Sequence, residues 1–186
     1  MAILVRCRSC GFVIEEGRLG EVCPACGVPR KVFEPFADTV SRKRRMLLSF
    51  DLHPIIVHFP VSFGVSAFAV AVFVLAFPEL FTDIATIVLA ALTGVLPAVA
   101  ALAIASGIFD GKIRFRRVTT PLLKRKIALG SLFFICSLAA AVLAFAVGPS
   151  AQWVRIVDAI LLANCVAAAV GLGKIGTRLA TAMFPG

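Results

Sequence analysis

Four cysteines near the start of the chain constrain its fold most. Cys7 and Cys10 form one C-x2-C pair, and Cys23 and Cys26 form a second pair after twelve intervening residues. Two such pairs facing each other make a tetrahedral cage of four thiolates for one metal ion. A cage of this kind holds either structural zinc or a redox-active iron. The spacing therefore predicts a metal centre in this part of the chain.

A glycine follows each cysteine pair, Gly11 after the first and Gly27 after the second. Glycine lets the chain turn through positive φ and aim backbone N–H groups at the sulfurs, which helps to hold the ligands. A scaffold of two disulfides is the competing interpretation. We expect a metal site instead, because the segment is strongly charged and no secretory leader precedes the cysteines.

The stretch CRSCGFVIEEGRLGEVCPACGVPRKVFEPF resembles a short rubredoxin-like domain, of the type found at the C-terminal end of rubrerythrins. The matching features are both C-x-x-C-G motifs, Pro24 inside the second motif, and the turn at residues 29–31 followed by Phe33. The resemblance covers residues 1–36 and implies a β-rich head in which four cysteines hold one iron that passes single electrons. Structural zinc is the alternative, because ribbon folds of both kinds share these motifs.

The head departs from that family in two ways. Phe12 stands after the first glycine, where the family often has tyrosine, and the chain contains no tyrosine. Four basic residues also flank the cysteines: Arg6, Arg8, Arg30 and Lys31. They are either a solvated surface or a charge that favours the reduced site and attracts an acidic partner.

The rest of the chain is dominated by long apolar runs. Hydrophobic residues make up 60% of the 186 residues, and they concentrate after about residue 50. Four runs are long enough to span a bilayer core, and helices satisfy their own backbone groups in lipid. We place these spans at residues 54–77, 84–109, 122–147 and 154–172. The predicted fold class is a small metal-bound β-rich head (1–36), a basic tether (37–52) and an all-α bundle of four transmembrane helices (53–186).

Basic residues are distributed unevenly between the connections. They precede the first span and fill the connection between the second and third spans, whereas the connection between the first and second has none. The two sets are Arg42, Lys43, Arg44 and Arg45, and Lys112, Arg114, Arg116, Arg117, Lys124, Arg125 and Lys126. The positive-inside rule then places both termini in the cytoplasm. The head would lie in a reducing compartment, which suits thiolate ligands.

The net charge of +9 needs no nucleic acid to explain it. Most of it lies beside predicted spans, where lysine and arginine meet anionic headgroups of the lipid bilayer. The run at residues 42–45 is short, contains no aromatic residue and adjoins a span, so we expect it to hold the head near the membrane surface. A head of this size also depends on its metal for folding, because it can bury little apolar surface.

The membrane half carries a second, looser resemblance. HPIIVHFP (53–60) and SGIFDG (106–111) resemble a bacterial family of four-span membrane proteins of uncharacterised function. The resemblance implies that the spans lie in a bacterial inner membrane. His53 and His58 are the only histidines, and on a helix they point about 140° apart. Haem b held by two histidines of one chain is therefore excluded, and Lys126 does not support a haem site.

Three roles are possible for His58. It could bind quinone beside Pro60, bind haem as a single ligand, or bond a neighbouring helix while His53 caps the span. We expect Asp110 to pair with a nearby lysine or arginine. We also expect Cys136 and Cys165 to be packing residues.

Among possible functions, the sequence favours a membrane-anchored one-electron carrier over a stand-alone enzyme. A soluble reductase or flavoprotein would deliver the electron, and quinone or a membrane redox partner would receive it. The first alternative is a structural zinc ribbon on a membrane scaffold that docks another protein. The second is a quinone-reactive oxidoreductase subunit that uses His58. No catalytic triad, phosphate-binding loop or pair of carboxylates indicates a hydrolase or transferase.

Overall fold

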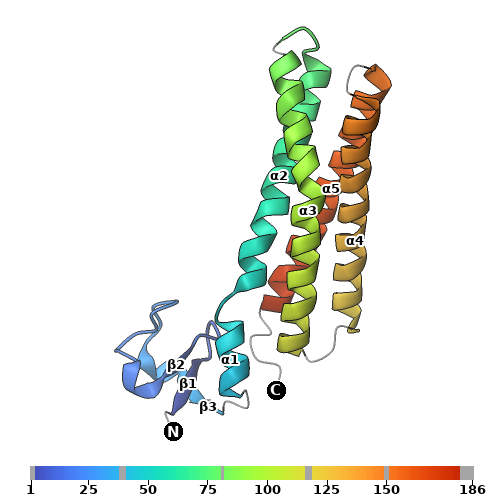
Figure 1. Cartoon of the computed structure of the whole chain (residues 1–186). Coiled ribbons are helices and arrows are strands. Elements are labelled where there is room, and N and C mark those ends of the chain that lie inside the picture. The colour runs from blue at the N-terminus through green and yellow to red at the C-terminus, as the bar shows by residue number, and fades with distance from the viewer. Residues whose placement is uncertain (1–2, 38–40, 81, 116–118, 149–150, 181–186) are drawn as a thin grey trace. The chain divides into compact units, whose positions relative to one another are not determined.

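The chain divides into two compact units, Met1–Arg45 and Met46–Pro185. The computed structural model describes residues 3–37, 41–80, 82–115, 119–148 and 151–180. Figure 1 shows a small sheet in the first unit and long helices in the second. These two parts confirm the predicted fold class.

The first unit contains a three-stranded antiparallel sheet of order β2–β1–β3. The strands are β1 (Leu4–Cys7), β2 (Val13–Glu15) and β3 (Phe33–Phe36), and the single-turn helices η1 (Glu16–Arg18) and η2 (Arg30–Val32) lie between β2 and β3. Val5 and Cys7 alternate with outward-facing residues along β1 and are buried, as the two-residue period of a strand requires. Besides the cysteines, Val5 and Leu19 are the buried apolar side chains of the described head.

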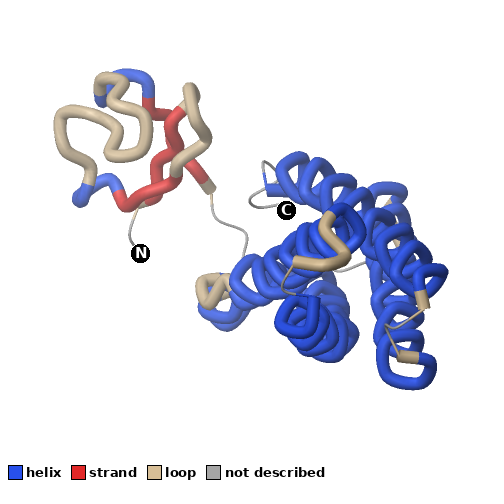
Figure 2. Tube along the Cα trace, turned by 90° about the horizontal axis from the view of Figure 1, so that it is seen from above, coloured by secondary structure: helices blue, strands red, loops and turns tan. Residues whose placement is uncertain are grey.

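The second unit is a bundle of four antiparallel helices. They are α2 (Leu52–Ala76), α3 (Thr82–Phe115), α4 (Pro121–Val142, continued by the π-helical η3, Leu143–Val147) and α5 (Gln152–Ala180). A short helix, α1 (Arg42–Leu48), precedes them. α2 packs on α3 and α5, and α4 packs on the same two helices, so the four close a ring that Figure 2 shows from its end. All four are long and apolar enough to cross a membrane.

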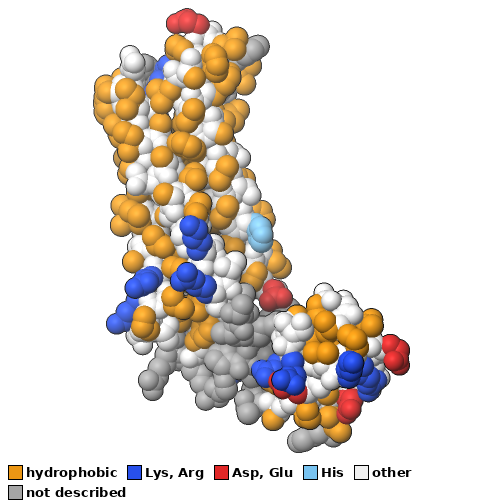
Figure 3. Space-filling model, turned by 180° about the vertical axis from the view of Figure 1, so that it is seen from behind, with side chains coloured by type: hydrophobic (Ala, Val, Ile, Leu, Met, Phe, Trp, Pro, Cys, Tyr) orange, Lys and Arg blue, Asp and Glu red, His pale blue; other side chains and the backbone are white. Residues whose placement is uncertain are grey.

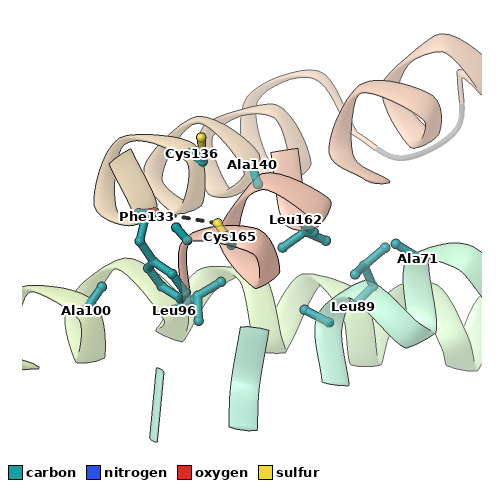
Figure 4. Close-up of a cluster of buried hydrophobic side chains, with 11 residues drawn as sticks. Ala71, Leu89, Leu96, Ala100, Phe133, Cys136, Ala140, Leu162 and Cys165 are labelled. Atoms are coloured by element: carbon teal, nitrogen blue, oxygen red, sulfur yellow. Dashed lines mark hydrogen bonds between the residues drawn. The ribbon is translucent and has the colours of Figure 1, made fainter. Parts of the chain in front are cut away.

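The core of the bundle combines a few large side chains with many small ones. Leu96 and Leu162 are fully buried, and Phe133 packs beside them against Cys165, whose thiol lies 3.5 Å from the Phe133 carbonyl oxygen (Figure 4). Five alanines fill the same cluster: Ala67, Ala71, Ala100, Ala140 and Ala168. Cys136 belongs to the cluster too, which confirms that both membrane cysteines are packing residues.

The outer surface of the bundle is apolar (Figure 3). Lysine and arginine gather towards one end of it, where α3 ends and α4 begins (Figure 3). Arg116 and Arg117, which we assigned to this connection, lie outside the described residues, as do the side chains of Arg42 and Arg45.

Two helices end later than we predicted from the sequence. α3 continues to Phe115 instead of residue 109, and α5 continues to Ala180 instead of residue 172. The apolar runs do end near the predicted positions, but lysine and arginine are good helix formers. The helices therefore continue through Lys112 and Lys174 after the apolar surface stops.

Candidate metal centre

Two tight turns of the same design position the four cysteines. In the first, the N–H of Gly11 donates to the carbonyl of Cys7 at 2.8 Å; in the second, the N–H of Gly27 donates to the carbonyl of Cys23 at 2.9 Å. The two glycines have φ of 78° and 75°, in the left-handed region that side chains disfavour. The sequence therefore needs glycine at both positions for the turns to close.

Both turns are anchored to the backbone on their far side. The Cys7 N–H donates to the carbonyl of Phe12, and the Cys23 N–H donates to that of Val28, both at 2.8 Å. Cys7 also ends β1 and pairs with Phe33 of β3. The first cysteine of each pair is thus fixed by backbone hydrogen bonds, while the second lies at the tip of its turn.

The sulfur atoms have the spacing of a tetrahedral metal site. The Sγ atoms of Cys7 and Cys26 lie 3.8 Å apart, those of Cys10 and Cys23 also lie 3.8 Å apart, and all four lie within 4.8 Å of one another. Four thiolates at about 2.3 Å from a central ion would form a tetrahedron with edges of about 3.8 Å. Two of the sulfur pairs already have this separation, and the others need to close by no more than about 1 Å, so the donor set fits one zinc or iron ion.

Exposure divides the four ligands into an inner and an outer pair. Cys7 and Cys23 are buried, with 0% and 2% of their surfaces exposed, whereas Cys10 and Cys26 are exposed. One sulfur from each turn therefore lies inside the head and the other at its surface.

The surroundings of the four cysteines shift the pKa values of two thiols in opposite directions. Burial raises the pKa of Cys23, but hydrogen bonds from the N–H groups of Cys26 and Ala25 lower it by more, to about 7. The N–H of Val28 lowers the pKa of Cys26, whereas partial desolvation of its sulfur and the three neighbouring sulfurs raise it by more, to about 12. A metal binds thiolates, so its binding releases the protons that the four cysteines still hold.

Part of the basic surface around the cage is neutralised within the head. Arg6 donates to Glu34 (Nε–Oε1 3.1 Å), and Arg8 approaches the other oxygen of the same carboxylate (Nε–Oε2 3.9 Å). The guanidinium of Arg6 also lies 5.6 Å from the ring centroid of Phe36. Arg30 has a structural contact, because its Nη1 donates to the Leu19 carbonyl at 2.8 Å.

A polar cluster inside the bundle was not foreseen from the sequence. His53 is buried, and its Nδ1 lies 3.0 Å from Ser106 Oγ on α3, while its Nε2 lies 2.9 Å from Lys126 Nζ on α4. A lysine ammonium can only donate, so Nε2 accepts from Lys126 and Nδ1 donates to Ser106. Ser106 in turn donates to the carbonyl of Ala103 at 2.9 Å. His53 thus joins three helices, and our expectation that it caps the first span is wrong.

The structure also shows where Asp110, His58 and Pro60 lie in the four-helix bundle. Asp110 pairs with Arg114 (Oδ2–Nε 3.4 Å), which confirms the predicted ion pair. His58 is exposed and Pro60 is buried, so the two do not line one pocket. The Nδ1 of His58 lies 2.6 Å from the carbonyl of Pro54, in its own helix and not in a neighbouring one.

Asp158, a single acidic residue in an apolar stretch of α5, was also not foreseen from the sequence. Its surface is 2% exposed, and its Oδ1 has no hydrogen-bond partner among the described residues. The sequence does contain a signal for this residue, because an acidic side chain inside a long apolar run is rare and usually has a function.

Comparison with known proteins identifies the head alone. Residues 6–34 match the family described as rubrerythrin, rubredoxin-like domain. A comparison with curated proteins gave no match, and neither did one with solved structures. The N-terminal part of this chain is therefore a rubredoxin-like metal-binding domain, followed by four candidate membrane-spanning helices. The resemblance of the membrane half to a four-span family stays a prediction.

Proposed function

We propose that the protein is a membrane-anchored one-electron carrier whose rubredoxin-like head holds one iron ion on Cys7, Cys10, Cys23 and Cys26. The spacing of the four sulfurs carries this proposal, because it fits a four-thiolate ion and occurs in a domain of the rubredoxin-like family. An iron bound there would alternate between ferric and ferrous, giving the site a net charge of about −1 or −2.

The geometry of the ligands favours electron transfer. Both turns are held by short backbone hydrogen bonds at Gly11 and Gly27, so the sulfurs are kept in nearly the same positions whatever the charge of the site. Cys10 and Cys26 place two sulfurs at the surface, which offers a short path to a partner in contact with the head. Backbone N–H groups of the turns point at the sulfurs and stabilise their negative charge.

The distribution of charge supports a cytoplasmic head. Lysine and arginine concentrate at the end of the bundle where α3 meets α4, which is the side that the positive-inside rule assigns to the cytoplasm. A soluble reductase or flavoprotein would then supply electrons from the cytoplasm. Quinone in the bilayer or a membrane complex would accept them.

Structural zinc is the second candidate, because a four-thiolate zinc site has the same sulfur spacing. In that case the head would be a docking module without redox turnover. The two candidates differ in metal and in colour, so one experiment separates them.

The test is the visible spectrum and metal content of the full-length protein, purified from cells supplied with iron and compared before and after dithionite. Ferric four-thiolate iron gives absorption that disappears on reduction, which we expect here. Cys10→Ser and Cys26→Ser should lose the iron and the colour, whereas Cys136→Ser, in the bundle core, should keep both. A colourless protein that contains zinc would refute electron transfer but retain the site. Full iron content in both ligand variants would refute the site itself.

A further inference from the structure

The lipid-facing side of α2 carries a line of three polar residues. His58, Ser62 and Ser66 are all exposed and follow one another at intervals of four, so they form one stripe along the helix. The buried side of α2 is formed by Pro60, Gly64, Ala67 and Ala71. Ser62 is two residues from both Pro60 and Gly64, which places it about 200° round the helix, facing away from the bundle core.

The stripe contains hydrogen-bonding groups that have no partner within the described residues. A backbone carbonyl can only accept, so the contact with Pro54 fixes the proton of His58 on Nδ1. Nε2 is then an acceptor on an exposed side chain, with no hydrogen-bond partner in the described chain. The hydroxyls of Ser62 and Ser66 have no partner within the residues that the structure describes.

Several other polar side chains of the bundle bond to their own helix. Thr93 donates to the carbonyl of Leu89, Ser137 to that of Phe134, and the exposed Asn164 to that of Ile160. Ser131 on α4 is exposed and also lacks a partner in the described chain, but its neighbours one turn away are Ile127 and Ile135. The stripe on α2 is therefore a group of open polar residues, whereas Ser131 is isolated.

Such a stripe fits the surface of another transmembrane helix. Lipid tails offer no hydrogen bonds, and helix contacts in membranes are rich in small residues and in serine or histidine side chains that bond across the contact. Ser62 and Ser66 form a small-xxx-small pair, and Ala69 continues it, also exposed. Two helices can therefore approach closely along this side.

A second copy of the chain supplies the complementary groups. All copies insert in the same direction, so two α2 helices that meet must run parallel about a two-fold axis along the membrane normal. In that arrangement the stripe faces itself. The hydroxyl of Ser62 can donate to the open Nε2 of His58 from the second copy, which lies one turn away along the axis. We infer that the protein forms a parallel homodimer through His58, Ser62 and Ser66 of α2.

The inference is tested with full-length protein in liposomes of a single phospholipid. Energy transfer between donor- and acceptor-labelled copies is measured while the ratio of protein to lipid is lowered. We expect the wild-type protein to dissociate on dilution as a dimer. Ser62→Ile combined with Ser66→Ile should weaken the apparent association by about tenfold or more, because it removes both the hydrogen bonds and the close approach. Ser131→Ile, a matched change on the lipid face of α4, should leave association unchanged.

A cysteine cross-link tests the same contact in a chain with an intact stripe. Ala69→Cys should form an intermolecular disulfide on mild oxidation, whereas Leu138→Cys, exposed on α4, should not. A protein that stays monomeric at every lipid ratio would overturn the dimer. Equal association of the double variant and Ser131→Ile, or cross-linking through residue 138 but not 69, would overturn the role of α2. None of these measurements depends on the metal in the head.

Discussion

Gly107 gives the most direct test of how the bundle is held together at its basic end. A Cβ atom added at Gly107 would lie 2.8 Å from Cε1 of His53 and 3.3 Å from both ring nitrogens. The ring cannot move away freely, because Ser106 holds one nitrogen and Lys126 holds the other. Gly107→Ala should therefore break at least one of these hydrogen bonds or push the helices apart.

The expected loss of stability follows from three contributions. Overpacking in a well-packed interior costs about 1–3 kcal/mol. Weakening a hydrogen bond to a charged group adds about 1.5–3 kcal/mol when the bond is lost. Replacing glycine by alanine within a helix returns about 0.5–1 kcal/mol. If one hydrogen bond is lost, we expect Gly107→Ala to lower the free energy of unfolding by about 1.5–5.5 kcal/mol.

The assay is reversible unfolding of the bundle in mixed detergent micelles, followed by circular dichroism as the fraction of denaturing detergent rises. Two glycines of α3 and α4 serve as controls. Gly94 would also place a Cβ within 2.9 Å of a ring, but that ring belongs to Phe145, which is 68% exposed and free to swing outwards. Gly130 has its nearest neighbour at 3.6 Å, an ordinary contact with Ile104. Gly94→Ala should cost less than about 1 kcal/mol, and Gly130→Ala should be neutral or stabilising.

A double-mutant cycle completes the test. In a His53→Ala background the ring is absent, so Gly107→Ala should lose most of its effect. The reasoning is refuted if Gly107→Ala unfolds like Gly130→Ala, or if its cost is the same with and without the ring of His53.

Two further results are expected. Removing the metal with a chelator should unfold residues 4–36 and leave the helices of the bundle intact, because Val5 and Leu19 alone provide too little apolar burial to hold the head. Limited proteolysis should cut the head only after chelation. A head that resists the protease equally well with and without its metal would contradict this expectation. Asp158→Val should raise the free energy of unfolding by about 1–3 kcal/mol in the same detergent assay, because it removes a buried oxygen that has no partner in the described chain. A loss of stability would mean that this carboxyl has a partner that the bundle needs.

The metal centre and the membrane spans could be predicted because each depends on a local pattern. Cys7 and Cys10 lie in one turn, Cys23 and Cys26 lie in another, and the spacing within each pair fixes its geometry. The rubredoxin-like resemblance of this segment was confirmed by the match at residues 6–34. The positions of the spans follow from the length of each apolar run.

The contacts between spans could not be predicted in the same way. His53 and Lys126 are 73 residues apart in the sequence, and nothing in either segment indicates that they meet. An apolar helix in a membrane also has similar residues on its inner and outer sides, so periodicity does not separate them. The sequence therefore did not indicate that Pro60 is buried in the core or that Ser62 is exposed on the outside of the bundle.

The division of the cysteines into an inner and an outer pair determines how a metal can enter and leave the head. Cys7 and Cys23 are closed off by the sheet and the turns, so an approaching ion, chelator or oxidant meets Cys10 and Cys26 first. Exchange of the metal must begin with release of one of these two sulfurs, while the inner pair keeps hold of the ion. The lifetime of the loaded head is then set by the tips of two turns, each of which closes only because a glycine follows its outer cysteine.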